Sequence, residues 1–297
     1  MFTLLLATTL AAATPRDALL VDAAWLKQHV NDPDLVLLQV GDEASYKAGH
    51  IAGARGIGLK EVSVSDHTAE GLMLEMPQAE DLRKRLESLG ISDNSRVIVY
   101  FAKDWVSPTT RVLLTLDYAG LGARASMLDG GLAAWQRAGG AVTTEPAAVK
   151  TGKLSPLRIK PLVVDAATVR SRIGAKGYAI VDGRAAVFYD GVEAGEDHAG
   201  KQRLGHIHGA VSIPFTSIND DDLRIKPTEE LRAIFAKAGV KADDTVIGYC
   251  HIGQQTTEML LAARLLGHPV LLYDGSYQDW SHRADFPVDN PSETASK

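Results

Sequence analysis

The sequence predicts an α/β protein built from two copies of one folding unit. Length is the first reason, because 297 residues exceed the size at which a single hydrophobic core usually stops growing. Repetition is the second reason, since three features return in the same order in the second half of the chain. They are GHIAGA at 49–54 and GHIHGA at 205–210, RVIVY at 96–100 and TVIGY at 245–249, and an Asp-Gly pair before tryptophan at Asp129 and Trp135 and at Asp274 and Trp280.

Each copy alternates short Val/Ile/Leu runs with amphipathic stretches, a pattern typical of a buried parallel sheet with helices on its faces. In the second copy the predicted strands are 179–181, 210–213, 246–249 and 270–273, and two of the predicted helices are 228–238 and 256–266. Between the copies, residues 139–161 carry glycines and prolines with little helical periodicity, which indicates a linker. We therefore expect one domain at 17–140, a linker at 141–160 and a second domain at 161–290.

The first thirteen residues (MFTLLLATTLAAA) are apolar, and the small residues Ala11 and Ala13 fit the cleavage pattern of a secretory signal. No Lys or Arg precedes the apolar run, so the usual basic start of such a signal is missing. The run is too short to span a bilayer, and we expect no membrane span. The hypothesis is export to the periplasm, with a cytoplasmic location as the alternative.

The charge balance argues against a nucleic-acid partner. The chain has a formal net charge of −6, and no cluster of Lys and Arg suited to binding phosphates is visible in it. An anionic substrate must therefore be met by local positive charge.

Cys250 is the only cysteine, and it stands where the predicted strand ending at Tyr249 gives way to a short loop and a helix. A single thiol forms no intramolecular disulfide, so its meaning depends on its surroundings. The loop 251–255 and the following helix N-terminus would direct backbone N–H groups and partial positive charge at the sulfur. Such surroundings favour a thiolate. The alternative is a buried, inert cysteine acting as a small hydrophobe.

Other polar and aromatic residues have plainer interpretations. His206 and His208 alternate as a metal pair could, but no further ligand cluster accompanies them, so hydrogen bonding within a loop is the better hypothesis. Asp182 and Asp274 follow apolar runs and are typical of turn or helix caps. The tryptophans at matching places in both copies indicate packing. We predict no metal site and no cofactor.

Taken together, several motifs of the second half resemble the rhodanese family of sulfurtransferases in its tandem two-domain form. The resemblance covers roughly residues 17–140 and 160–287, nearly the whole chain after the apolar start. It implies a five-stranded parallel sheet flanked by helices in each half. The motifs are DGR at 182–184, RLGHIHGA at 203–210, the loop CHIGQQ at 250–255, and YDGS at 273–276 leading to Trp280.

The resemblance also implies that the first half is catalytically silent. Phe101 occupies the cysteine position, and Gln39 and Gly41 replace Asp182 and Arg184. A phenyl ring offers no nucleophile, so this half is expected to act as a scaffold beside the active cleft.

The mechanism implied by the family is transfer of sulfane sulfur through a persulfide on Cys250, from a small sulfur-containing anion to cyanide, a thiol or a protein acceptor. His251 and Arg184 are the candidate cations for the donor; for Arg184, structural pairing with an acid such as Asp182 or Glu193 weighs equally. The predicted substrate-binding residues are Arg184, His251, Ile252, Gly253, Gln254 and Gln255.

Departures from the family pattern bear on the donor. Thiosulfate-specific members usually carry Arg and Lys after the cysteine, where this chain has His251 and Ile252. Members that use 3-mercaptopyruvate generally have Gly and Ser there, and a second arginine where this chain has Phe188. Because the carboxylate would lose a bidentate partner, thiosulfate is the preferred donor.

There are three alternatives to sulfur transfer from thiosulfate. 3-Mercaptopyruvate sulfur transfer is the first, and a non-catalytic role in sulfur binding or relay is the second. A cysteine phosphatase is disfavoured, since it needs an arginine six residues after the nucleophile and Thr256 stands there.

Overall fold

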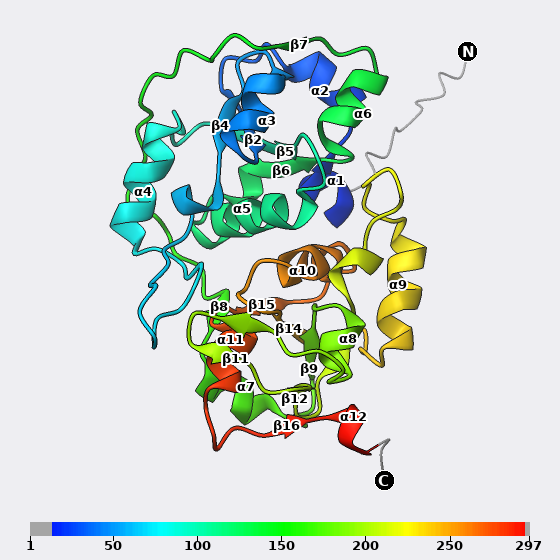
Figure 1. Ribbon diagram of the computed structural model, residues 1–297. Helices are drawn as coiled ribbons and strands as arrows, with labels where there is room; N and C mark the ends of the chain where they lie inside the picture. The colour runs from blue at the N-terminus through cyan, green and yellow to red at the C-terminus, as the bar shows by residue number, and fades with distance from the viewer. Residues whose placement is uncertain (1–13, 295–297) are drawn as a thin grey trace, which may run out of the picture.

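Each copy folds around its own five-stranded parallel sheet, as the computed structural model shows for residues 14–294 (Figure 1). The predicted α/β class and the two flanked sheets are confirmed. The predicted signal segment falls on residues 1–13, outside the described residues. Among the residues described, no helix is both long enough and apolar enough to cross a membrane.

In the first sheet the strand order is β1-β6-β5-β2-β4, and every neighbouring pair is parallel. Its strands are β1 (Leu20–Val21), β2 (Leu35–Val40), β4 (Arg55–Ile57), β5 (Arg96–Phe101) and β6 (Ala125–Leu128). The helices of this half are α1 (Pro15–Leu19), α2 (Ala23–His29), α3 (Glu43–Ala48), α4 (Ala79–Ser88), α5 (Val106–Tyr118) and α6 (Gly131–Arg137), with 3₁₀ turns η1 (Leu59–Glu61) and η2 (Gly122–Arg124).

The second sheet repeats this topology, with the order β13-β9-β14-β15-β8, again parallel throughout. Its strands are β8 (Val163–Val164), β9 (Tyr178–Asp182), β13 (Val211–Ser212), β14 (Thr245–Tyr249) and β15 (Val270–Tyr273). The helices are α7 (Ala166–Arg172), α8 (Ala186–Tyr189), α9 (Thr228–Lys237), α10 (Thr256–Leu265), α11 (Ser276–Ser281) and α12 (Pro291–Thr294), with the 3₁₀ turn η3 (Phe215–Ser217).

Three short antiparallel pairs complete the described elements. β3 (His50–Ile51) pairs with β7 (Val142–Thr143), β12 (His206–Ile207) with β16 (Val288–Asp289), and β10 (Glu196–Asp197) with β11 (Gly200–Lys201). The repeated GHI motif thus forms the same kind of short ribbon in both halves. In each half a buried tyrosine hydroxyl, Tyr100 or Tyr249, accepts the N–H of the isoleucine in this motif.

Strand register gives a residue-by-residue correspondence between the halves. Gln39 lies opposite Tyr100 in the first sheet, and Asp182 lies opposite Tyr249 in the second. The next residue along the central strand is Phe101 in one half and Cys250 in the other. The matching of these two residues therefore follows from the ladder as well as from the sequence.

The two halves share one hydrophobic core. Helices α5 and α10 lie between the two sheets, as Figure 1 shows, and they pack on one another. Their apolar residues belong to one continuous buried cluster that includes residues of both sheets. A separate cluster covers the outer face of each sheet, and Trp135 and Trp280 lie buried in these two clusters. The prediction that the tryptophans serve packing is confirmed.

The predicted linker is bound to the first half over much of its length. His50 Nε2 lies 2.9 Å from the carbonyl of Glu145, and the Leu154 N–H donates to Glu87 at 2.9 Å. Leu154 is buried in the shared core. The linker therefore forms part of the surface of the first domain.

Candidate active site

Cys250 begins a six-residue loop between β14 and α10, at the carboxyl edge of the second sheet. In parallel α/β proteins this edge is where ligands gather. The Cys250 side chain is 0% exposed, so a sulfur donor reaches it only after neighbouring side chains shift. The backbone of the loop is tied to α11, because the N–H groups of Tyr277 and Gln278 donate to the carbonyls of Cys250 and His251 at 2.9 and 3.0 Å.

The loop presents free backbone donors. Across residues 14–294, no acceptor takes a hydrogen bond from the N–H groups of residues 251–255. Gly253 makes the turn possible, because its φ of +74° is a left-handed conformation that favours glycine. A side chain there would also meet the Asp274 carbonyl at 2.8 Å. The loop therefore has the form of an anion cradle at a helix N-terminus.

Ser276 anchors the start of the loop. Its Oγ accepts the Cys250 N–H at 3.2 Å and donates to the Tyr273 carbonyl at 2.8 Å. Ser276 is fully buried with φ +51°, an unfavourable conformation for a residue with a side chain. Its counterpart in the first half is Gly131, at φ +56°. The half that carries the cysteine thus accepts backbone strain in order to hold the Cys250 amide.

Arg184 pairs with Asp182 beside the loop. Its Nε and Nη2 donate to the Asp182 carboxylate at 2.6 to 3.1 Å, and Nη2 also donates to the Gly205 carbonyl at 2.7 Å. The guanidinium lies 3.9 Å from the ring centre of Tyr277. Burial opposes the charge, but Asp182 outweighs burial and raises the pKa of Arg184. Nη1 donates to no other residue in the described part of the chain, so one guanidinium nitrogen remains for a ligand.

His251 corrects one sequence prediction. Burial, together with the nearby Arg184 charge, lowers the pKa of His251 to about 4, although Asp182 acts in the opposite direction. The ring packs edge-on against Phe188 with 4.5 Å between centres. His251 is therefore neutral at pH 7 and is wrong as a candidate cation. The sequence could not show this, because Phe188 lies far from it in the chain.

The other predicted loop residues take different positions. Gln254 Nε2 donates to Ser107 Oγ of the first half at 3.2 Å. Gln255 is the residue before α10, and its Oε1 is buried without a hydrogen bond from the described residues. Ile252 is half-buried and brings no charge. The loop thus offers amides, while Arg184 offers the cation.

The first half holds this loop through Arg111, a residue that the sequence analysis missed. Arg111 projects from α5 and is 0% exposed. Its Nη1 donates to the Gly253 carbonyl at 2.8 Å and to Asp274 Oδ1 at 2.6 Å, and its Nη2 donates to the Leu74 carbonyl. The one signal in the sequence was an arginine directly before the largely apolar run VLLTL at 112–116. Asp274 is thus part of an ion pair between the domains.

A strap from the first half, residues 73–76, reinforces this contact. The Met76 N–H donates to Asp274 Oδ2 at 2.7 Å, and the Met73 N–H donates to Gln278 Oε1 at 3.0 Å. Burial and the Asp274 carboxylate raise the pKa of Glu75 to about 8, against the pull of Arg111. The strap therefore brings a carboxyl whose neutral form is favoured by its surroundings.

Glu258, in the first turn of α10, is a second buried carboxyl at the interface. It is 1% exposed, and its Oε1 has no partner among the described residues. Burial first, and Asp104 of the first half second, raise the pKa of Glu258 to about 8. Glu258 falls within the predicted helix at 256–266, but its burial depends on the other half of the chain and could not be predicted from the helix alone.

The histidines of the GHIHGA segment make hydrogen bonds. His206 Nδ1 lies 2.7 Å from the Tyr189 carbonyl, and its ring stacks on Tyr189. His208 Nδ1 lies 2.7 Å from Asp289 Oδ1. In the described range, no group of three or more His, Cys, Asp or Glu side chains is placed to hold a metal ion.

Comparison with known proteins gives the family. The model of the rhodanese-like domain matches twice, at residues 22–138 and 165–283. The chain belongs to the rhodanese family. This rhodanese is 31% identical over 280 residues to the 3-mercaptopyruvate sulfurtransferase of Escherichia coli K12, covering 91% of this chain and 97% of the relative. It is 30% identical over 279 residues to the thiosulfate sulfurtransferase of Rattus norvegicus, covering 89% and 92%. It is a tandem rhodanese sulfurtransferase.

Solved structures agree with this fold. A variant of EanB in complex with ergothioneine superposes on the rhodanese with a TM-score of 0.82 at 21% identity, covering 94% of this chain and 71% of that one. The crystal structure of YnjE gives a TM-score of 0.80 at 23% identity, covering 94% and 70%. At these identities the likeness supports the fold alone.

Proposed function

We propose that this rhodanese transfers sulfane sulfur from thiosulfate to cyanide or a thiol through a persulfide on Cys250. The observation that carries the proposal is the position of Cys250 at the head of a loop with five backbone N–H groups unused by residues 14–294. Together with the α10 N-terminus, these dipoles stabilise negative charge on the sulfur. No neighbouring general base is then required.

The transfer proceeds in two displacements. The Cys250 thiolate attacks the outer sulfur of thiosulfate, the sulfur–sulfur bond of the donor breaks, and sulfite leaves with the electron pair. A cyanide ion or a thiolate then attacks the terminal sulfur of the persulfide and returns Cys250 as thiolate. Arg184 Nη1 steadies the anionic donor, and residues 251–255 bind the charge that moves onto the outer sulfur.

The donor preference rests on the cations around the loop. A 3-mercaptopyruvate carboxylate is best held by an arginine fork. The Nε and Nη2 of Arg184 already donate to Asp182, and Phe188 stands where a second arginine would be needed. These features favour thiosulfate. The similarity to the Escherichia coli 3-mercaptopyruvate enzyme makes 3-mercaptopyruvate the second candidate donor.

The alternative to sulfur transfer onto a small acceptor such as cyanide is a relay, in which the sulfur passes to another protein. A relative from Thermus thermophilus that is 29% identical over 282 residues is named a sulfur carrier protein. In a relay, Cys250 would accept sulfur from a donor and pass it to another protein, while transfer to cyanide would be slow.

The test compares the wild type with Cys250→Ser, using thiosulfate and 3-mercaptopyruvate as donors. We expect thiocyanate formation from thiosulfate and cyanide in the wild type only, and one added sulfur atom by intact-mass spectrometry after donor incubation. Equal rates in both proteins, or no added sulfur with either donor, would reject the Cys250 persulfide. Faster turnover with 3-mercaptopyruvate would reassign the donor. A stable persulfide without thiocyanate would favour the relay.

A further inference from the structure

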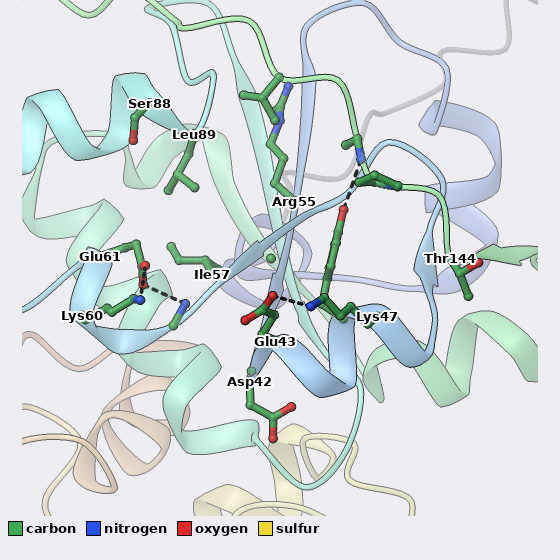
Figure 2. Close-up of a pocket in the computed structure, with 17 residues that line it drawn as sticks. Asp42, Glu43, Lys47, Arg55, Ile57, Lys60, Glu61, Ser88, Leu89 and Thr144 are labelled. Atoms are coloured by element: carbon green, nitrogen blue, oxygen red, sulfur yellow. Dashed lines mark hydrogen bonds and ion pairs between the residues drawn. The ribbon is translucent and has the colours of Figure 1, made fainter.

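A cavity lies in the first domain, apart from the Cys250 loop (Figure 2). It holds about 790 Å³ between the edge strand β4, helix α3, the end of α4 and the linker. Its lining residues all fall between Gly41 and Val149, so none comes from the half that carries Cys250. The volume is within the range of pockets that hold small organic molecules.

Arg55 is the unusual residue of this cavity. Its side chain is half-buried: Nε and Nη1 are buried and make no hydrogen bond to the described residues, and Arg55 takes part in no ion pair within residues 14–294. Burial lowers the pKa of Arg55. Two nitrogens of this guanidinium have therefore lost water without gaining a partner, which is costly, while Nη2 stays accessible. A bound anion is the group that would offset this cost.

The remaining charges around the cavity are already compensated. Each of the two lysines has a nearby glutamate, and the aspartate caps helix α3, so Arg55 is the one lining cation without a counter-ion among the described residues. The pairs are Lys47 with Glu43 at 2.6 Å, Lys60 with Glu61 at 3.7 Å, and the Ser45 N–H donating to Asp42 at 2.6 Å. Because the lining carries three cations and three carboxylates, its formal charge is zero, and a monoanion is accommodated there more easily than a dianion.

The walls around Arg55 are largely apolar. Ile57 and Leu89 lie on one side in Figure 2, and Pro146 and Val149 of the linker also line the space. Tyr46 contributes its ring, because its hydroxyl already donates to the Ala54 carbonyl at 2.8 Å and accepts the Ala147 N–H at 3.3 Å. These walls suit an aliphatic or aromatic body.

We propose that this cavity binds a small monocarboxylate with an apolar body, whose carboxylate pairs with Arg55. The carboxylate would accept from the accessible Nη2 of the guanidinium, while the body would lie against the apolar walls. The linker forms one wall because its hydrogen bonds to the first domain hold it there. The site is separate from sulfur transfer.

Calorimetric titration of the full chain with hexanoate and with benzoate tests the proposal. We expect at least one of them to bind, and Arg55→Met to weaken that binding about tenfold or more, since a charge-assisted hydrogen bond is lost. Arg55→Lys should lose less. Lys47→Met is the matched control, because Lys47 lines the same cavity but is paired with Glu43, and it should change the affinity less than about twofold.

Two control ligands and one activity assay make the outcome decisive. Benzamide, the neutral analogue of benzoate, and inorganic phosphate should both bind more weakly than the carboxylates. Thiocyanate formation by Arg55→Met should equal that of the wild type, which also shows that the variant is folded. No binding of either carboxylate to the wild type, equal binding by Arg55→Met, or tighter binding of phosphate would overturn the proposal.

Discussion

Replacing Glu258 with glutamine is expected to stabilise the protein in a pH-dependent manner. Glu258 is 1% exposed, has an unpartnered oxygen among the described residues, and lies near Asp104. Its pKa rises from the ordinary value of 4.5 to about 8 in the folded protein. The folded state therefore holds a proton that the unfolded state releases, and stability is lost as the pH rises from about 4.5 toward 8.

The size of the effect follows from the shift in pKa. In the unfolded chain the carboxyl is ionised above pH 4.5, whereas in the folded protein it keeps its proton at pH 7. Each pH unit between 4.5 and 7 costs about 1.4 kcal/mol, so at pH 7 Glu258 lowers the free energy of unfolding by about 3 kcal/mol relative to a neutral isostere. Glu258→Gln should raise the free energy of unfolding by about that amount at pH 7, and by about 0 at pH 4. Glu75, whose pKa is also raised to about 8, adds a slope of the same sign that remains in this variant.

The assay is urea-induced unfolding followed by tryptophan fluorescence between pH 4 and pH 9. Glu230→Gln on α9 is the matched control, because Glu230 is exposed and its replacement should leave the pH slope unchanged. Parallel pH curves for the wild type and Glu258→Gln would refute the reasoning, since they would mean that Glu258 is ionised in the folded protein.

Four further predictions concern the loop and its supports. Arg111→Met should lower the free energy of unfolding by about 3–5 kcal/mol, because Asp274 would stay buried without its partner; the double variant with Asp274→Asn should recover part of this loss in urea unfolding, and additive losses would contradict the ion pair. Both Ser276→Ala and Ser276→Gly remove the hydroxyl, but alanine keeps the left-handed strain whereas glycine relieves it. Ser276→Ala should therefore slow thiocyanate formation more than Ser276→Gly, and equal rates would show that strain is irrelevant. Ile252→Lys should lower the KM for thiosulfate by an effect on the order of 1 kcal/mol, since it adds a charge beside a dianion, and an unchanged KM would argue against thiosulfate. His251→Asn should leave the pH dependence of kcat/KM between pH 6 and 8 unchanged, because a group with a pKa of about 4 does not titrate there; a lost inflection in that range would contradict it.

Most of the fold could be predicted from local sequence patterns. The Val/Ile/Leu runs at 246–249 and 270–273 form the interior strands β14 and β15, and the predicted helix at 256–266 corresponds to α10. Such periodicity depends on neighbours in the chain, so it is readable from one sequence. The place of Cys250 at a strand end follows from the same information.

The electrostatics of the site could not be predicted in this way. Arg111 and Asp274 lie 163 residues apart, and their contact depends on how α5 meets the second half. The charge state of His251 depends on burial beside Phe188, and that of Glu258 depends on burial at the domain interface. Each is a consequence of desolvation by distant residues, which residue type alone does not reveal.

The first domain lacks both the nucleophile and the groups that support it, yet it contributes to the Cys250 loop. A side chain at Gly131 would come within 2.5 Å of the Phe101 carbonyl and 2.7 Å of the Phe101 ring, so the two together leave no room for a side chain there. Ser276 occupies the same place beside the smaller Cys250 and binds its amide. A cysteine at position 101 alone would therefore lack the serine anchor, because Gly131 stands in its place, and the Asp–Arg pair, because Gln39 and Gly41 stand there. What the first domain supplies instead is Arg111, whose donors fix the far side of the Cys250 loop at Gly253 and Asp274.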